Sequence, residues 1–219
     1  MFETLQPAPP DKILALIGLY RADPRPNKVD LGVGVYRDGA GRTPVLRAVR
    51  EAEKRLWQSQ DTKTYLGLSG DIAFNAAMID LVFGKDADTS RIRAAQAPGG
   101  SGALRLVAEL LQRSRPGVTV WTSDPTWPNH LPIMRGAGLA TRDYPYFDEA
   151  TGKVRFDAMV ETLKGAAAGD VVLLHGCCHN PTGANLDAAQ WQMLADLLAE
   201  RKLLPFVDLA YQGFGDGLE

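Results

Sequence analysis

The sequence predicts an α/β fold in which a mostly parallel sheet carries helices on both faces. From residue 92 onward, strand-like runs alternate with helical stretches, and this alternation is typical of βαβ units. Residues 171–174 form a continuous apolar run, Val-Val-Leu-Leu, as expected for a strand that is buried on both faces of a sheet.

The segment before residue 92 is predicted to be mainly helical. Residues 6–10 are rich in proline and cannot form the interior of a helix. Capping residues and apolar periodicity then mark the later elements. These are a helix that Asp11 caps and that ends near Asp23-Pro24, an extended segment at 29–36, an amphipathic helix from Pro44 to about Gln58, and a helix at 71–83.

The second part of the chain supplies the predicted sheet and its covering helices. Strands are predicted at 92–97, 118–123, 139–144, 171–175 and 204–208. Helices are predicted between them at 103–113, 129–135, 156–163 and 187–201.

Composition narrows the class of protein. The chain has 219 residues and a formal net charge of −2, and its basic residues are scattered. We therefore expect no nucleic-acid partner and no anionic membrane partner. No apolar run approaches the length of a membrane span, and no signal peptide is visible at Met1, so the expected location is the cytoplasm.

Four segments that follow strands carry chemically capable side chains. Ligands of open parallel sheets bind beyond the carboxyl ends of the strands, so each segment is a candidate site. In the first, Gly100 and Gly102 flank Ser101 at a predicted helix start. Glycines allow the backbone to approach a phosphate, and the helix start offers free N–H groups. A plain tight turn explains the same residues equally well.

Trp127 and Asn180 belong to the second and third segments. Trp127 stands between two prolines and could stack on an aromatic cofactor ring, or could simply pack in the core. Asn180 could donate a hydrogen bond to a ligand oxygen, or could only build the Asn-Pro-Thr-Gly turn.

Two histidines and two cysteines lie within residues 175–179. Structural zinc sites draw spaced pairs of ligands from two separate segments, and the sequence contains no second pair. We therefore expect no metal site. The adjacent Cys177 and Cys178 also give no sign of a disulfide framework.

The fourth segment contains Asp208 and Tyr211. An acid at the end of an apolar strand is costly unless it is paired, so Asp208 could pair with a buried cation. Tyr211, three residues further on, could face the same crevice. The alternative is an aspartate that caps the following turn.

Six blocks together resemble the aspartate/aromatic family of class I pyridoxal-phosphate-dependent aminotransferases. The resemblance covers the whole chain in order. The blocks are Leu31–Asp38, Thr64–Gly70, Pro98–Arg105, Ser123–His130, His175–Gly183 and Asp208–Phe214. It implies the large domain of a fold-type I transferase, truncated, with an arm and small-domain segment at 1–44 and an incomplete cofactor-binding domain at 45–219.

The resemblance also implies roles around pyridoxal 5'-phosphate. Asp208 would pair with the protonated pyridine nitrogen, and His130 and His175 would orient Asp208 from behind. Tyr211 and Asn180 would donate to the phenolic oxygen of the cofactor. The remaining implied roles are ring stacking beside the substrate for Trp127, phosphate binding for Gly100, Ser101, Gly102 and Tyr65, and substrate binding for Gly34, Trp127 and Asn180.

The implied reaction transfers an amino group between an amino acid and a 2-oxo acid. The amino acid would be an aromatic one, or aspartate or glutamate, or both classes would be accepted. The implied assembly is a homodimer with shared active sites, in which Tyr65 reaches the partner's cofactor. The family carries its Schiff-base lysine in a serine-rich segment after the strand that ends in Asp208, and no lysine of this chain lies there. We therefore expect the 219-residue chain alone to be inactive.

Two alternatives stay open at this point. One is a catalytically inert fragment that acts at most as an interaction module. The other, more remote, is a serine hydrolase in which Ser101 is the nucleophile, with His179 and either Asp143 or Asp148 as its partners. That reading leaves Trp127 unexplained.

Overall fold

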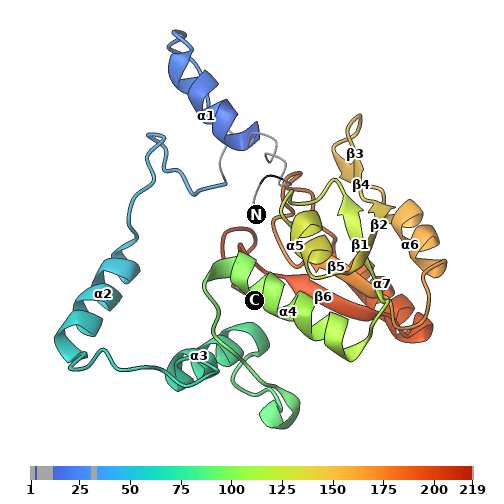
Figure 1. Cartoon of the computed structure of the whole chain (residues 1–219). Coiled ribbons are helices and arrows are strands. Elements are labelled where there is room, and N and C mark those ends of the chain that lie inside the picture. Colours follow the sequence, from blue (N-terminus) through green and yellow to red (C-terminus); the bar gives the residue numbers. More distant parts are fainter. Residues whose placement is uncertain (1–2, 4–11, 31–33, 219) are drawn as a thin grey trace. The chain divides into compact units, whose positions relative to one another are not determined.

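The computed structural model describes residues 3, 12–30 and 34–218 (Figure 1). The chain divides into two compact units, residues 1–64 and residues 65–219, and each is described by itself. The domain boundary predicted between residues 44 and 45 stays a prediction.

The first unit contains two helices. Helix α1 spans Lys12–Ala22, and the predicted capping residue Asp11 lies outside the described residues. Helix α2 spans Arg47–Ser59 and starts three residues later than predicted, because the backbone of Leu46 is still extended (φ −59°, ψ 145°). The described residues of the predicted extended segment, 29–30 and 34–36, belong to no strand.

The second unit is built on a four-stranded parallel sheet with the order β2-β1-β5-β6 (Figure 1). The strands are β1 Thr119–Asp124, β2 Ala140–Pro145, β5 Val171–His175 and β6 Leu204–Asp208. The predicted bounds of β5 and β6 are confirmed, and β1 and β2 lie one residue later than predicted. The predicted parallel sheet is therefore confirmed.

Helices cover both faces of this sheet, because successive side chains of a strand point to opposite sides. Val171 and Leu173 of β5 pack with helices α4 and α5, whereas Val172 and Leu174 pack with α6 and α7. The four helices are α4 Gly99–Ser114, α5 His130–Gly136, α6 Phe156–Lys164 and α7 Ala188–Arg201. The predicted covering helices are confirmed on both faces.

The predicted strand at 92–97 is wrong. This segment is irregular, and it contacts residues 69–71 instead of the sheet: Gln96 donates its backbone N–H to Ser69 O (2.9 Å), and its side chain accepts from Asp71 N (3.0 Å). Without a neighbouring strand, its apolar residues cannot complete a ladder. The 3₁₀ turn η1 Thr89–Arg91 lies before it.

Three further elements complete the second unit. Helix α3 spans Ile72–Phe83, close to the prediction, and Asp71 caps it by accepting from Phe74 N (2.7 Å). An antiparallel hairpin of β3 Phe147–Asp148 and β4 Lys153–Val154 was not predicted.

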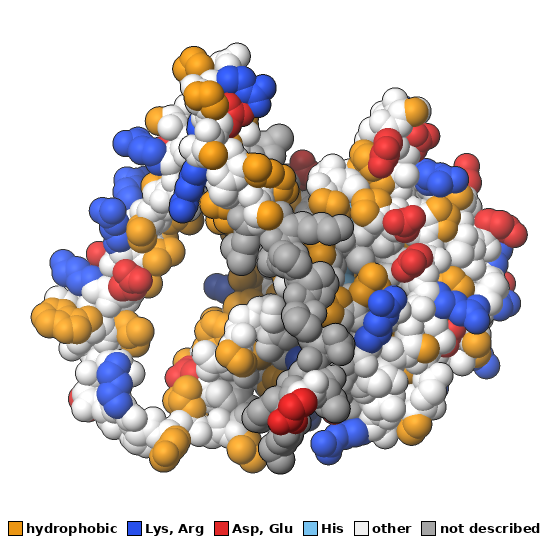
Figure 2. Space-filling view, turned by 45° about the horizontal axis from the view of Figure 1, so that its top comes forward, with side chains coloured by type: hydrophobic (Ala, Val, Ile, Leu, Met, Phe, Trp, Pro, Cys, Tyr) orange, Lys and Arg blue, Asp and Glu red, His pale blue; other side chains and the backbone are white. Residues whose placement is uncertain are grey.

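The surface agrees with the low net charge. Basic and acidic side chains are interspersed over the face drawn in Figure 2. Within the described ranges, no helix combines the length and the apolar character that crossing a bilayer requires.

Candidate active site

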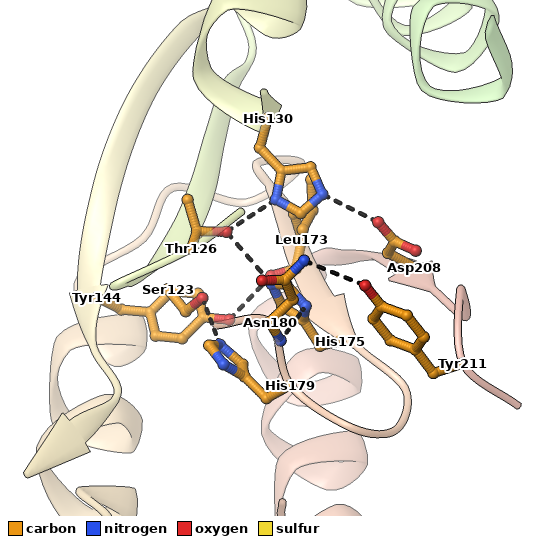
Figure 3. Close-up of polar contacts among 10 residues, drawn as sticks. All are labelled: Ser123, Thr126, His130, Tyr144, Leu173, His175, His179, Asn180, Asp208 and Tyr211. Carbon is orange, nitrogen blue, oxygen red and sulfur yellow. Dashed lines mark hydrogen bonds and ion pairs between the residues drawn. The ribbon is translucent and has the colours of Figure 1, made fainter. Parts of the chain in front are cut away.

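Three turns meet at one edge of the sheet. Strands β1, β5 and β6 are neighbours, and the register pairs His175, the last residue of β5, with Asp208, the last residue of β6. Parallel strands end at the same edge, so the turns that follow Asp124, His175 and Asp208 lie close together. The predicted site residues of three segments are thus brought to one place (Figure 3).

Asp208 is held by a histidine from helix α5. Its Oδ2 lies 3.0 Å from Nε2 of His130, which is completely buried, whereas the Asp208 side chain is 20% exposed. The hydrogen bond from His130 lowers the pKa of Asp208, although burial acts in the opposite direction. Asp208 is therefore a carboxylate at neutral pH.

A hydroxyl connects His130 to a second histidine. Thr126 Oγ1 lies 2.8 Å from Nδ1 of His130 and 3.2 Å from Nε2 of His175. Burial lowers the pKa of His175 to about 4. His175 is therefore a neutral imidazole with one N–H group.

The backbone fixes the position of the proton on His175. The N–H of Asn180 donates to Nδ1 of His175 (3.4 Å), so Nδ1 carries no proton and Nε2 does. His175 then donates to Thr126. The carboxylate of Asp208 can only accept, so Nε2 of His130 carries the proton of their contact.

The Asn180 side chain faces the turn after β6. Its Nδ2 donates to Oη of Tyr211 at 3.4 Å, as Figure 3 shows. Trp127 lies partly buried beside His130, edge to face, with 5.3 Å between ring centroids and an interplanar angle of 87°. The structure thus gathers Trp127, Asn180, Tyr211 and Asp208 around one edge of the sheet.

The glycine-rich segment forms the first turn of α4, four residues before the predicted helix start. Gly99 has a left-handed φ of +69°, which favours glycine. A Cβ on Gly102 would lie 2.9 Å from the ring of Pro98. Gly100 and Ser101 are exposed, and the first-turn N–H groups of a helix lack partners within that helix. The segment can therefore bind an anion.

Two predicted site residues lie apart from this group. Gly34 belongs to the first unit, so its relation to the three turns is not described. Tyr65 begins the second unit with a fully exposed side chain. Their roles at a shared active site stay predictions.

The residues of the hydrolase alternative are not brought together. Both ring nitrogens of His179 are bonded, to Ser123 and Thr182, and not to Ser101. The carboxylate of Asp143 accepts from Thr122 (2.9 Å). The carboxylate of Asp148 accepts from backbone N–H groups of its own turn. The structure therefore gives Ser101 neither of the partners that this alternative needs.

Across the described residues, no group of three His, Cys, Asp or Glu side chains is placed to hold a metal ion. Cys177 and Cys178 are free thiols of intermediate exposure.

Sequence reasoning gave His179 a role only in the hydrolase alternative and missed its place beside His175. Its side chain is almost completely buried (2% exposed) and stacks between the rings of Tyr146 and His175. Its place in the turn after β5 was a signal, but its partner Ser123 precedes it by 56 residues. No local pattern reports such a contact.

Known proteins resemble the whole chain. The family model described as aminotransferase class I and II matches residues 26–219. A tyrosine aminotransferase of Rhizobium meliloti (strain 1021) is 55% identical over 219 residues, which cover 100% of this chain and 56% of that protein. An aspartate aminotransferase of Escherichia coli (strain K12) is 49% identical, with the same two coverages.

Solved structures agree with these relatives. The crystal structure of an aromatic amino acid aminotransferase from Burkholderia cenocepacia J2315 superposes with a TM-score of 0.95 at 48% identity, covering 100% of this chain and 56% of that one. A Burkholderia pseudomallei aromatic-amino-acid aminotransferase, described as covalently bound to pyridoxal phosphate, gives 0.94 at 43% identity, covering 100% and 55%. The chain thus spans about half the length of the relatives it matches, and it belongs to the class I and II aminotransferase family.

Proposed function

We propose that the complete protein containing this chain is a pyridoxal-phosphate-dependent aminotransferase. It would move an amino group between an amino acid, aromatic or aspartate and glutamate, and a 2-oxo acid. The names of the relatives support both substrate classes, since they include tyrosine, aromatic-amino-acid and aspartate aminotransferases. The observation that carries the proposal is the carboxylate of Asp208, kept anionic by His130.

The residues at the three turns suit pyridoxal 5'-phosphate. Asp208 is an anion that accepts one hydrogen bond from the side chain of His130, so it can also pair with a protonated pyridine nitrogen. Bound pyridoxal phosphate supplies an electron-withdrawing ring that stabilises the charge left when the substrate loses its Cα proton. Asp208 would keep that ring protonated, and His130 and His175 would keep Asp208 ionised and oriented.

The other site residues would hold the remaining parts of the cofactor. Asn180 and Tyr211, already in mutual contact at 3.4 Å, would donate to the phenolic oxygen. Trp127 would stack on the ring and lie beside the substrate. Gly100, Ser101 and Gly102 would bind the phosphate with the first-turn N–H groups of α4 and a hydroxyl. The Schiff-base lysine that the family carries would transfer the Cα proton.

We further propose a homodimer in which the partner's Tyr65 contributes to the phosphate site and Gly34 lines the substrate entrance. Helix α3 supports an assembly of this kind, because it is apolar and none of its residues is buried within this chain. Ile72 and Phe83 illustrate this, with 83% and 56% of their surface exposed. An apolar helix of this size ordinarily packs against another surface.

A substrate panel tests the proposal. The complete protein, loaded with pyridoxal phosphate, is given tyrosine, phenylalanine, aspartate or glutamate with a 2-oxo acid, and the new 2-oxo acid is quantified. We expect amino transfer from at least one class. Asp208→Ala removes a charged hydrogen-bond partner of about 1.5–3 kcal/mol, so the rate should fall roughly 10- to 150-fold.

Asp196→Ala is the matched control, because Asp196 accepts only from Gln192 on the exposed face of α7. Its rate should equal that of the unaltered protein. A loaded protein that transfers no amino group from any of the four amino acids would refute the proposed function.

A further inference from the structure

The three histidines of the chain all lie in this site, but only two belong to the string that ends on Asp208. His179, the third, is buried and has both ring nitrogens occupied. Nε2 lies 2.9 Å from Ser123 Oγ, and Nδ1 lies 2.9 Å from Thr182 Oγ1. Burial, and then nearby His175, lower the pKa of His179 to about 3, so its ring is neutral.

A backbone group also holds one partner of His179. The N–H of Ala184 donates to Thr182 Oγ1 (3.2 Å), and the same oxygen lies beside Nδ1 of His179. The ring of His179 thus links Thr182 of its own turn to Ser123 on strand β1.

Ser123, the partner of His179, belongs to the sheet as a buried residue of strand β1. On the neighbouring strand β2, Tyr144 donates to the backbone carbonyl of Leu173 in β5 at 2.8 Å (Figure 3). The bond between His179 and Ser123 therefore anchors His179 to strand β1.

Ring contacts hold His179 from both sides. It stacks on Tyr146 with 4.0 Å between centroids and an interplanar angle of 14°, and it lies 4.1 Å from the His175 ring at 40°. Tyr146 in turn donates to Ala184 O at 2.7 Å. The next residue after His179 is Asn180, whose N–H sets the proton position on His175. Displacing His179 would therefore displace that donor.

We propose that His179 is a positioning residue that ties the turn after β5 to β1 through Ser123, so that the Asn180 N–H stays on the His175 ring. Thr126, which receives the His175 proton, follows Ser123 on the same segment by three residues. The bond between His179 and Ser123 thus keeps the donor Asn180 N–H and the acceptor Thr126 at a fixed separation on either side of the His175 ring. A role of His179 in catalysis rests on the proposed function, but its effect on the proton position of His175 does not.

The test reads the proton position by NMR on the 219-residue chain labelled with ¹⁵N, without cofactor. Protonated and bare imidazole nitrogens have well separated ¹⁵N shifts, and only three histidines contribute. In the unaltered chain His175 should show a bare Nδ1 and a protonated Nε2. In Ser123→Ala and in His179→Phe, which keeps the ring but loses both hydrogen bonds, the two His175 nitrogens should move toward an averaged shift.

Matched variants separate this role from general stability. Ser114→Ala also loses a serine hydroxyl bond, to Leu111 O at the end of α4, and should leave the His175 shifts unchanged. His179→Gln places an amide N–H near the former Nε2 and should restore the His175 signature. His179→Asn reaches only the Thr182 side and should not restore it.

Unchanged His175 shifts in both Ser123→Ala and His179→Phe would overturn the proposal, as would rescue by His179→Asn and not by His179→Gln. If His179→Phe does not fold, Ser123→Ala decides alone. Because the measurement needs no cofactor, it separates this inference from the proposed function: absent amino transfer with the expected shifts refutes only the latter.

Discussion

Acidification should destabilise the second unit, because His175 and His179 are neutral in the folded chain. Their pKa values are about 4 and about 3, below the ordinary value of 6.5. As the pH falls below 6.5, the unfolded chain binds protons that the folded chain does not. The stabilisation is thus complete above pH 6.5 and is lost progressively as the pH falls toward about 3.

The size of the effect follows from the two shifts. One pKa unit corresponds to about 1.4 kcal/mol, so each histidine contributes about 2 kcal/mol between pH 7 and pH 5. Water still reaches part of the site, and we take about half of that sum, about 2 kcal/mol in total. This is a large part of the stability of an ordinary domain.

Urea unfolding at pH 7 and pH 5, followed by tryptophan fluorescence, measures this loss. The same experiment on His179→Phe removes one titrating group, so the loss between the two pH values should fall to about half. Equal free energies of unfolding at pH 7 and pH 5 in the unaltered chain would refute the neutral-histidine reasoning. A larger pH-dependent loss in His179→Phe would refute the assignment to His179.

Two substitutions test how the turns are built, both by urea unfolding. Asp170→Ala removes the acceptor of Trp121 Nε1 (2.9 Å) and of two backbone N–H groups, and should cost about 2–4 kcal/mol, whereas the exposed Asp196→Ala should stay within about 0.5 kcal/mol. Gly102→Ala drives a methyl group into Pro98 and should cost about 1–3 kcal/mol, whereas Gly100→Ala meets nothing within 4 Å and should be neutral or stabilising. Equal effects within either pair would contradict the geometry described here.

The sequence predicted the sheet well where periodicity and burial agree. Strand β5 is apolar at four successive positions and is buried on both faces, so its bounds match. Residues 92–97 are interrupted by Arg93 and Gln96, and a strand also needs a neighbour, which the described structure does not give this segment. The hairpin of β3 and β4 has only two residues in each strand, too few for a periodic signal.

The site was predictable as far as topology reaches. Strand ends of a parallel sheet share an edge, so the turns containing Trp127, Asn180 and Asp208 could be grouped from the sequence alone. The bond between Ser123 and His179 could not be predicted, because it depends on the distance between the turn after β5 and strand β1 in three dimensions. The proton position on His175 was also out of reach, since it depends on the backbone N–H of Asn180.

The N–H of Asn180 explains how a neutral histidine can serve an anionic site. A side chain hydroxyl or imidazole can reverse its role as donor and acceptor, but a backbone N–H can only donate. Asn180 therefore keeps the single proton of His175 on Nε2, facing Thr126, next to the contact in which His130 donates to Asp208. The surroundings of Asp208 thus depend on the fold of the turn after β5, which Asp208 also contacts by accepting from the Gly176 N–H at its backbone carbonyl (2.8 Å). A substitution in that turn can change the chemistry of the site while every residue that would contact the cofactor stays the same.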